Sequence, residues 1–193
     1  AAENGVGRAS NQGRRADAER TFVLAAKASQ EGAAQFDKSN PMRRMSLARV
    51  PVRRASIELS LGDAAQAYER AMAAAAAIEA MDVGESGFAA RMRDGVLPMA
   101  LGVAVEAALR LERCQDAEAL ARKRIALPKN PFMNPLDDTA IRQVQLAYAS
   151  ACLGRGDEAR SIIAPAIKYY AGNEKAGAND TFFNADYATA LLA

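Results

Sequence analysis

The sequence predicts an all-α protein. Roughly a quarter of its 193 residues are alanine, the residue with the highest helix propensity. Aromatic residues make up only 6% of the chain, and runs of β-branched residues, which favour strands, are nearly absent. Half of the residues are hydrophobic and a quarter are charged, so we expect a folded chain with a buried core. Small side chains are expected where its helices touch.

Apolar residues recur at spacings of three and four, which is the periodicity of an amphipathic helix. One such stripe consists of Ile141, Val144, Ala147, Tyr148, Ala151 and Cys152. The pattern predicts helices over residues 14–30, 41–61, 63–81, 87–112, 115–126, 136–153, 157–170 and 181–192. A helix remnant over residues 1–12 would bring the number from eight to nine.

Asparagine and proline mark two helix starts. The pairs at 40–41 and 134–135 each place a capping side chain before a proline at the first helical position, where the missing N–H costs nothing. Prolines inside three predicted helices are expected to kink them or to mark their true starts: Pro51, Pro98 and Pro165. Glycine-containing linkers are expected at residues 32–39, 128–135 and 172–179.

Four segments repeat one pattern, in which a polar turn precedes an acidic, alanine-rich helix start. Glycine stands in three of these turns, and Cys114 replaces it in the other. The central alanines of the four segments are Ala18, Ala67, Ala119 and Ala159, which are 49, 52 and 40 residues apart. Each of the last three turns also follows a helical stretch, so the repeating unit is helix, tight turn, helix.

This unit resembles a tetratricopeptide (TPR) repeat. Small residues fall at its first-helix position at Ala55, Ala107 and Ala147. Further alanines follow in the second helices at Ala25, Ala74, Ala126 and Ala166. The spacing exceeds the usual 34 residues, and most aromatic and terminal proline signatures are missing. The resemblance implies one domain over residues 1–193, a TPR-like array of antiparallel helical hairpins, that is, an α-solenoid of about eight to nine helices. We expect it to be a fragment of a longer polypeptide.

The composition excludes several function classes. The chain has no histidine, which removes Ser-His-Asp and Cys-His catalysis, histidine-based zinc sites and the usual proton shuttle near neutral pH. We therefore expect no enzyme, no catalytic residue, no metal and no cofactor. Cys114 and Cys152 lack redox or metal-site spacing and are either two free thiols or a single bridge. No apolar run is long enough to span a membrane, and the compartment, cytoplasm or periplasm, stays open.

Positive charge is concentrated near the N-terminus. Residues 1–54 hold 11 Lys and Arg against 5 Asp and Glu, whereas residues 55–193 hold 14 against 18. Five arginines form a cluster: Arg43, Arg44, Arg49, Arg53 and Arg54. They could bind a partner's acidic segment, carboxylate or phosphate, or they could form a solvated face neutralised by other residues. Nucleic acid is not expected, because no aromatic residues interleave with the arginines.

The resemblance further implies that the first helices line a concave surface. The exposed positions of these helices are the candidate partner-binding residues, and they are expected to be Arg49, Arg53 and Ser56 in one unit and Arg142, Gln145 and Tyr148 in another. Tyr148 could instead be a packing residue with its hydroxyl at the rim.

The predicted function is a non-catalytic scaffold that binds a protein or peptide. The resemblance implies a docking or sensory domain of a bacterial signalling or regulatory protein. An alternative is a small-molecule-sensing domain, which would need a closed apolar pocket of several hundred Å³ between helices. A helical enzyme would require Asp, Glu and Arg side chains converging in one cleft, and the spacing does not indicate this. The oligomeric state stays open.

Overall fold

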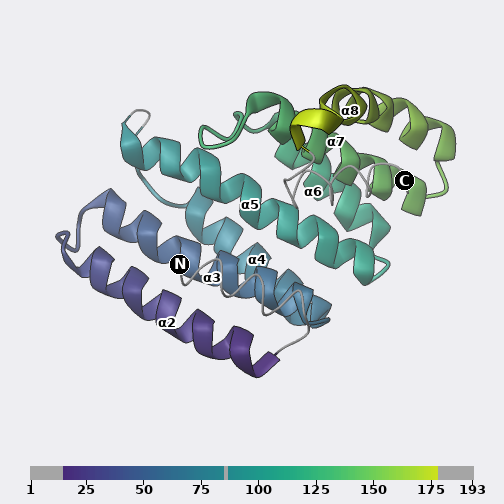
Figure 1. The fold of residues 1–193 in the computed structure, drawn as a ribbon. Coiled ribbons are helices and arrows are strands. Elements are labelled where there is room, and N and C mark those ends of the chain that lie inside the picture. Colours follow the sequence, from purple (N-terminus) through teal and green to yellow (C-terminus); the bar gives the residue numbers. More distant parts are fainter. Residues whose placement is uncertain (1–14, 85–86, 178–193) are drawn as a thin grey trace.

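The computed structural model of the chain describes residues 15–84 and 87–177. Within these ranges every regular element is an α-helix, so the expected all-α class is confirmed (Figure 1). The helices are α2 (Arg15–Ala34), α3 (Pro41–Ser60), α4 (Ala64–Glu79), α5 (Phe88–Arg110), α6 (Cys114–Ala126), α7 (Pro135–Cys152) and α8 (Gly156–Gly177). These seven fall short of the eight to nine expected, and the helices predicted over residues 1–12 and 181–192 lie outside the described residues.

All seven described helices begin within one residue of their predicted starts. The Asn40 side-chain oxygen accepts a hydrogen bond from the Met42 N–H at 2.8 Å, and Asn134 does the same for Leu136 at 2.9 Å. Both asparagines therefore cap their helices as expected. The three internal prolines all lie inside helices, and none of them marks a helix start.

Two helix ends were predicted too early. α2 continues to Ala34 and α8 to Gly177, so Gly32 and Gly172 lie within helices rather than in linkers. A Cβ at either glycine would meet no atom within 4 Å. Neither position needs glycine for space, and the two glycines mark no helix end.

The described helices stack in chain order. Each packs against the next, and α3 also contacts α5, which in turn contacts α7. Within the described part of the chain, the backbones of α4 and α6 stay apart, as do those of α6 and α8, and side-chain ion pairs bridge them: Lys123 to Glu79 at 2.6 Å and Arg122 to Glu158 at 3.1 Å. α3, α5 and α7 therefore form a continuous packed layer, and α4, α6 and α8 lie along its side, where ion pairs link them (Figure 1). Among these helices α2 packs only against α3, and α8 packs against α7 and forms an ion pair with α6, so the layer is open at both ends.

Alanine makes this close stacking possible. The largest buried cluster joins α3, α4, α5, α6 and α7, and several of its alanines are fully buried: Ala55, Ala71, Ala100, Ala104 and Ala108. A second cluster joins α7 to α8 around Ala147, Ile163 and Tyr170. Small side chains let helix axes approach without leaving cavities, so these contacts follow from the composition.

Three helix-to-helix turns share one geometry. Each ends its first helix with a residue of positive φ: Gly62 at 90°, Glu112 at 57° and Gly154 at 76°. The residue that follows donates its N–H five residues back, as Asp63 does to the Glu58 carbonyl at 2.8 Å. The same bond measures 2.9 Å in the second turn and 3.0 Å in the third. These are Schellman motifs, in which glycine is the usual residue of positive φ.

The second of these turns corrects the sequence alignment by two residues. Glu112, not Cys114, occupies the position of the turn glycine. The buried second-helix alanine of this unit is therefore Ala117, whereas Ala119 is exposed. The same shift places Arg124 where Ala126 was expected. Glycine was an unreliable marker here because glutamate also adopts the left-handed conformation, at a cost in energy.

Candidate functional site

Three of the five clustered arginines form hydrogen bonds or ion pairs between α3 and other segments of the chain. Arg43 donates to the Phe36 carbonyl at 3.1 Å, and Arg44 donates to the Asp82 carbonyl at 2.8 Å. Arg54 forms ion pairs with Glu19 of α2 and with Glu58 on its own helix. The guanidinium groups of these arginines are therefore engaged within the fold.

Arg54 belongs to a network that joins three helices. Its guanidinium lies 5.3 Å from the ring centre of Phe22 on α2. Glu58 is 2% exposed and also accepts from Arg70 of α4 at 2.9 Å. The hydrogen bond to Glu19 raises the pKa of Arg54, although burial opposes this effect. The buried Glu58 carboxylate is paired twice, so removing one of its arginines would leave a buried charge with less compensation.

Arg49 and Arg53 differ from the other three arginines. Neither forms a hydrogen bond or ion pair with any described residue, and Arg53 is exposed. They are four residues apart, so they lie on one face of α3. Ser56 continues this face, and its hydroxyl donates to the Val52 carbonyl at 3.3 Å. We call Arg49, Arg53 and Ser56 the α3 face; Arg49 is half-buried on it and Arg53 is exposed.

Arg142, expected at an exposed position, is buried. Only 1% of its side chain is exposed, and it forms an ion pair with Asp138 at 2.7 Å. It also donates to the backbone carbonyls of Arg124, Leu127 and Pro128 at 2.6, 2.9 and 2.8 Å. The expectation of exposure was wrong, because this guanidinium satisfies carbonyl groups at the end of α6 and holds the connection to α7.

Gln145, also expected to be exposed, is 6% exposed. Its amide nitrogen donates to the Gly102 carbonyl at 3.2 Å and to the Glu106 carboxylate at 2.9 Å, while its oxygen accepts from Arg124. A Cβ at Gly102 would lie 3.1 Å from the Arg124 guanidinium carbon. A glycine on α5 therefore makes room for a buried arginine of α6. Sequence reasoning missed this polar cluster, since no short motif carries it.

Tyr148 is partly buried against the cluster between α7 and α8. Burial raises the pKa of its hydroxyl. Tyr148 therefore lies where a packing residue is expected, which was the second of the two interpretations of this residue.

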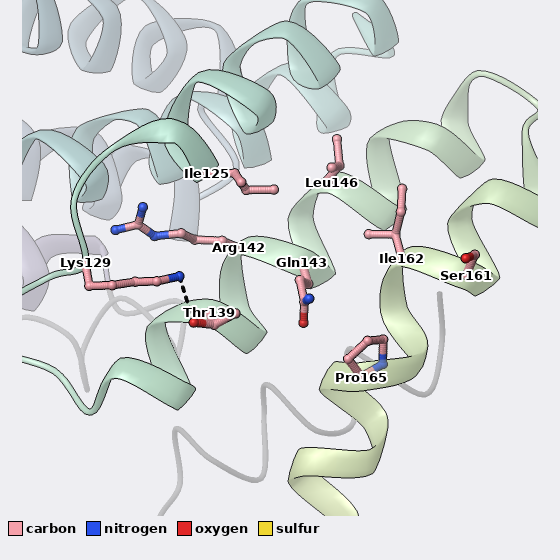
Figure 2. Close-up of a pocket in the computed structure, with 9 residues that line it drawn as sticks. All are labelled: Ile125, Lys129, Thr139, Arg142, Gln143, Leu146, Ser161, Ile162 and Pro165. Atoms are coloured by element: carbon pink, nitrogen blue, oxygen red, sulfur yellow. Dashed lines mark hydrogen bonds between the residues drawn. The ribbon is translucent and has the colours of Figure 1, made fainter.

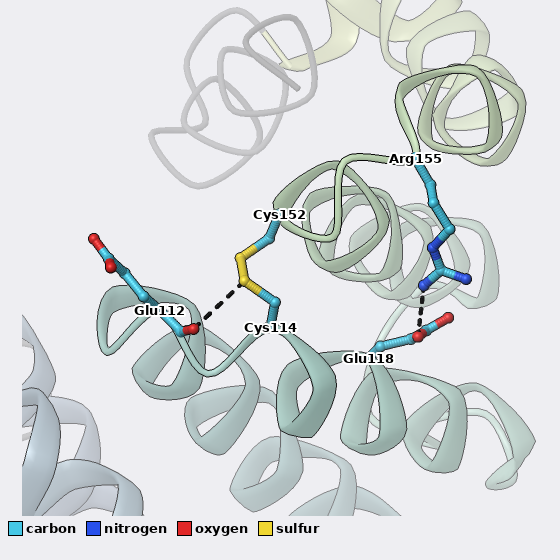
Figure 3. Close-up of a disulfide and its surroundings, with 5 residues drawn as sticks. All are labelled: Glu112, Cys114, Glu118, Cys152 and Arg155. Carbon is cyan, nitrogen blue, oxygen red and sulfur yellow. Dashed lines mark hydrogen bonds and ion pairs between the residues drawn. A yellow bond between two sulfur atoms is a disulfide. The ribbon is translucent and has the colours of Figure 1, made fainter.

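The two cysteines form a disulfide. Cys114 at the start of α6 is bonded to Cys152 at the end of α7, with their Cα atoms 5.5 Å apart (Figure 3). Beside it, Arg155 donates to Glu118 at 2.6 Å. Hydrogen bonds from Arg155 and Arg122 lower the pKa of this carboxyl group. Of the two alternatives left open by the sequence, the structure has the single bridge, which joins neighbouring hairpins covalently.

A cleft of about 270 Å³ lies between α6 and α8, with α7 at its floor (Figure 2). Nine residues line it: Ile125, Lys129, Thr139, Arg142, Gln143, Leu146, Ser161, Ile162 and Pro165. Several of them are exposed, so the cleft opens to solvent. It is not the closed apolar pocket that the small-molecule alternative requires.

No protein-family model, curated protein or solved structure matches this chain. Among residues 15–84 and 87–177, no helix has the length and apolar character needed to cross a bilayer. The same residues contain no group of three or more cysteine or carboxylate side chains arranged to hold a metal ion. The functional argument therefore depends on the geometry of the surfaces described above.

Proposed function

We propose that the chain is a non-catalytic TPR-like binding domain that holds an acidic peptide segment of a protein partner on the α3 face. The open layer of α3, α5 and α7 supports this proposal, because a layer that does not close on itself offers an extended surface to a peptide. The turns shared by successive helix pairs support the description as a repeat array.

The pair of unengaged guanidinium groups on α3 is the observation that carries the proposal. Arg49 and Arg53 stand on one face and have no acidic partner among the described residues. A guanidinium can accept a carboxylate through two parallel hydrogen bonds, so aspartate or glutamate side chains fit these positions. Exposed ion pairs contribute only about 0.2–1 kcal/mol each, so we expect the arginines to select the peptide while other contacts add affinity.

The resemblance to TPR repeats is also the basis for a proposed role in the cell. We propose a docking or sensory domain of a bacterial signalling or regulatory protein, in which this surface recruits a partner to a neighbouring module. The proposed binding needs no chemical step.

Selection from a displayed random-peptide library tests the function. We expect the wild-type chain to enrich peptides rich in Asp and Glu and the Arg49→Gln/Arg53→Gln variant to lose this enrichment. The matched control is Lys38→Gln/Lys168→Gln, which removes the same charge from two exposed lysines with no partner among the described residues.

Equal losses in both double variants would show that only net charge matters and would contradict a site on α3. A stoichiometric small molecule in native mass spectrometry, with no peptide selected, would favour the small-molecule alternative instead.

A further inference from the structure

The cleft between α6 and α8 results from the way the helices stack. α6 and α8 both pack on α7, but their backbones stay apart and are bridged at one point by the Arg122–Glu158 ion pair of 3.1 Å, so part of α7 stays uncovered between them. Leu146 on α7 forms part of the floor, Ile125 of α6 borders one side, and Ile162 and Pro165 of α8 border the other (Figure 2). Lys129, from the connection between α6 and α7, reaches in at one end.

Aliphatic side chains line the floor and both sides of the cleft. Leu146 is 7% exposed, whereas Ile125 is 39% exposed at the edge. An aliphatic group placed between these side chains would remove more of their surface from water, which is favourable at about 25 cal/mol per Å².

One end of the cleft carries the Lys129 ammonium group, which has no carboxylate partner among the described residues. Lys129 Nζ donates to the Thr139 hydroxyl oxygen at 2.8 Å, and that hydroxyl donates to the Pro135 carbonyl at 2.6 Å. The ammonium group therefore has further N–H donors to offer. No described carboxylate pairs with it, because the nearby Asp138 is paired with Arg142.

Asp137, the other carboxylate at the start of α7, is also engaged elsewhere. It accepts a hydrogen bond from the Tyr169 hydroxyl at 2.5 Å. Among the described residues the Lys129 ammonium thus has no anionic partner, and an anion in the cleft would supply one.

We propose that this cleft binds a carboxylate group attached to a short aliphatic chain. The carboxylate would accept hydrogen bonds from Lys129, and the chain would lie against Leu146 and Ile162. The volume of about 270 Å³ is just below the range of about 300–1,000 Å³ typical of drug-sized ligands, so the site fits a smaller molecule. This site is separate from the α3 face and does not depend on the proposed function.

Titration of the full ¹⁵N-labelled chain with 4-methylpentanoate, followed by amide chemical shifts, tests the proposal. We expect saturable shifts at Lys129, Thr139, Gln143 and Ile162, with a Kd of the order of 1 mM for a ligand of this size. The uncharged analogue 4-methylpentanamide is expected to bind at least about tenfold more weakly, because it lacks the charge.

Two variants and one control locate the binding. Lys129→Gln removes the charge and is expected to weaken binding about tenfold. Gln143→Phe places a ring in the cleft and is expected to weaken binding at least as much, while the shifts of remote amides show that each variant is folded. Lys38→Gln, on the connection between α2 and α3, should bind like the wild type.

An aliphatic carboxylate can belong to a polypeptide C-terminus or to a free aliphatic acid. A peptide ending in leucine distinguishes these two ligands. Tighter binding of the peptide than of 4-methylpentanoate assigns the cleft to a polypeptide C-terminus, and equal or weaker binding assigns it to a free aliphatic acid. Either result supports the site. The proposal is overturned if no saturable shifts occur at the cleft, if acid and amide bind equally, or if the Gln143→Phe variant binds like the wild type.

Discussion

Replacing Glu112 by glycine is expected to stabilise the protein. Glu112 holds the left-handed position of the turn between α5 and α6, with φ at 57°. Its side chain is exposed, and its carboxylate pairs with no described residue, so the substitution removes no such interaction (Figure 3). The equivalent positions in the other two turns are Gly62 and Gly154.

The expected gain is the difference between two backbone terms. A left-handed conformation costs a residue with a Cβ about 1–2 kcal/mol. Glycine avoids this cost but adds about 0.4–1 kcal/mol of unfolded-chain entropy, which leaves a net gain of about 0.5–1 kcal/mol. For a chain of this size that is a rise in Tm of roughly 1–4 °C. A Cβ at Gly62 or Gly154 would meet no atom within 4 Å, so packing does not enter this comparison.

Urea unfolding of the oxidised protein measures this change. Glu69→Gly is the matched control, because Glu69 is an exposed residue in the middle of α4 with no partner among the described residues. It is expected to lose about 1 kcal/mol. If Glu112→Gly destabilises the protein as Glu69→Gly does, residue 112 is not left-handed and the equivalence of the three turns is wrong.

Three further predictions concern contacts that the structure defines. Breaking the bridge with the double variant Cys114→Ser/Cys152→Ser is expected to lower the free energy of unfolding by about 4 kcal/mol, given the sequence separation of 38, as measured by urea unfolding. Arg142→Met leaves the buried Asp138 carboxylate unpaired and is expected to cost about 3–5 kcal/mol in the same assay. Burial and a hydrogen bond to a carboxylate raise the pKa of Tyr169 from 10.0 to about 12. Because the folded state holds this proton more tightly, its stabilising contribution is complete below pH 10 and is lost as the pH rises through 12. Tyr169→Phe should remove that part of the pH dependence of unfolding.

Each of these predictions has a result that would contradict it. The prediction for the disulfide is contradicted if a reductant leaves the urea unfolding of the wild-type chain unchanged. Arg53→Met is the control for Arg142→Met and should change stability by less than about 0.5 kcal/mol, since Arg53 is exposed. Equal losses in these two variants would contradict the burial of Arg142. A Tyr169→Phe variant with the wild-type pH dependence would show that this hydroxyl is not buried.

The helix starts could be predicted because local sequence determines them. The Asn-Pro pairs at 40–41 and 134–135 supply both a capping oxygen and a proline, and both asparagines cap their helices. Helix ends lack an equally specific signal. The helices pass through Gly32 and Gly172, because glycine lowers helix stability without forbidding a helix.

The candidate site was predictable only in part. A five-arginine cluster is visible in the sequence, but which arginines stay unengaged depends on partners far along the chain, such as Glu19 for Arg54 and the Asp82 carbonyl for Arg44. The burial of Arg142 depends on carbonyl groups of the preceding helix and connection. Helical periodicity places such a residue on a face but does not reveal what covers that face.

The most direct test of the proposed function observes the arginine side chains themselves. Titrating the ¹⁵N-labelled chain with an Asp- and Glu-rich peptide, and following the guanidinium Nε–H resonances, separates available arginines from engaged ones. The account predicts that the Nε–H signals of Arg49 and Arg53 shift with a common Kd while that of Arg142 stays in place. Unchanged Arg49 and Arg53 signals at saturating peptide, or equal shifts at all exposed arginines, would contradict it.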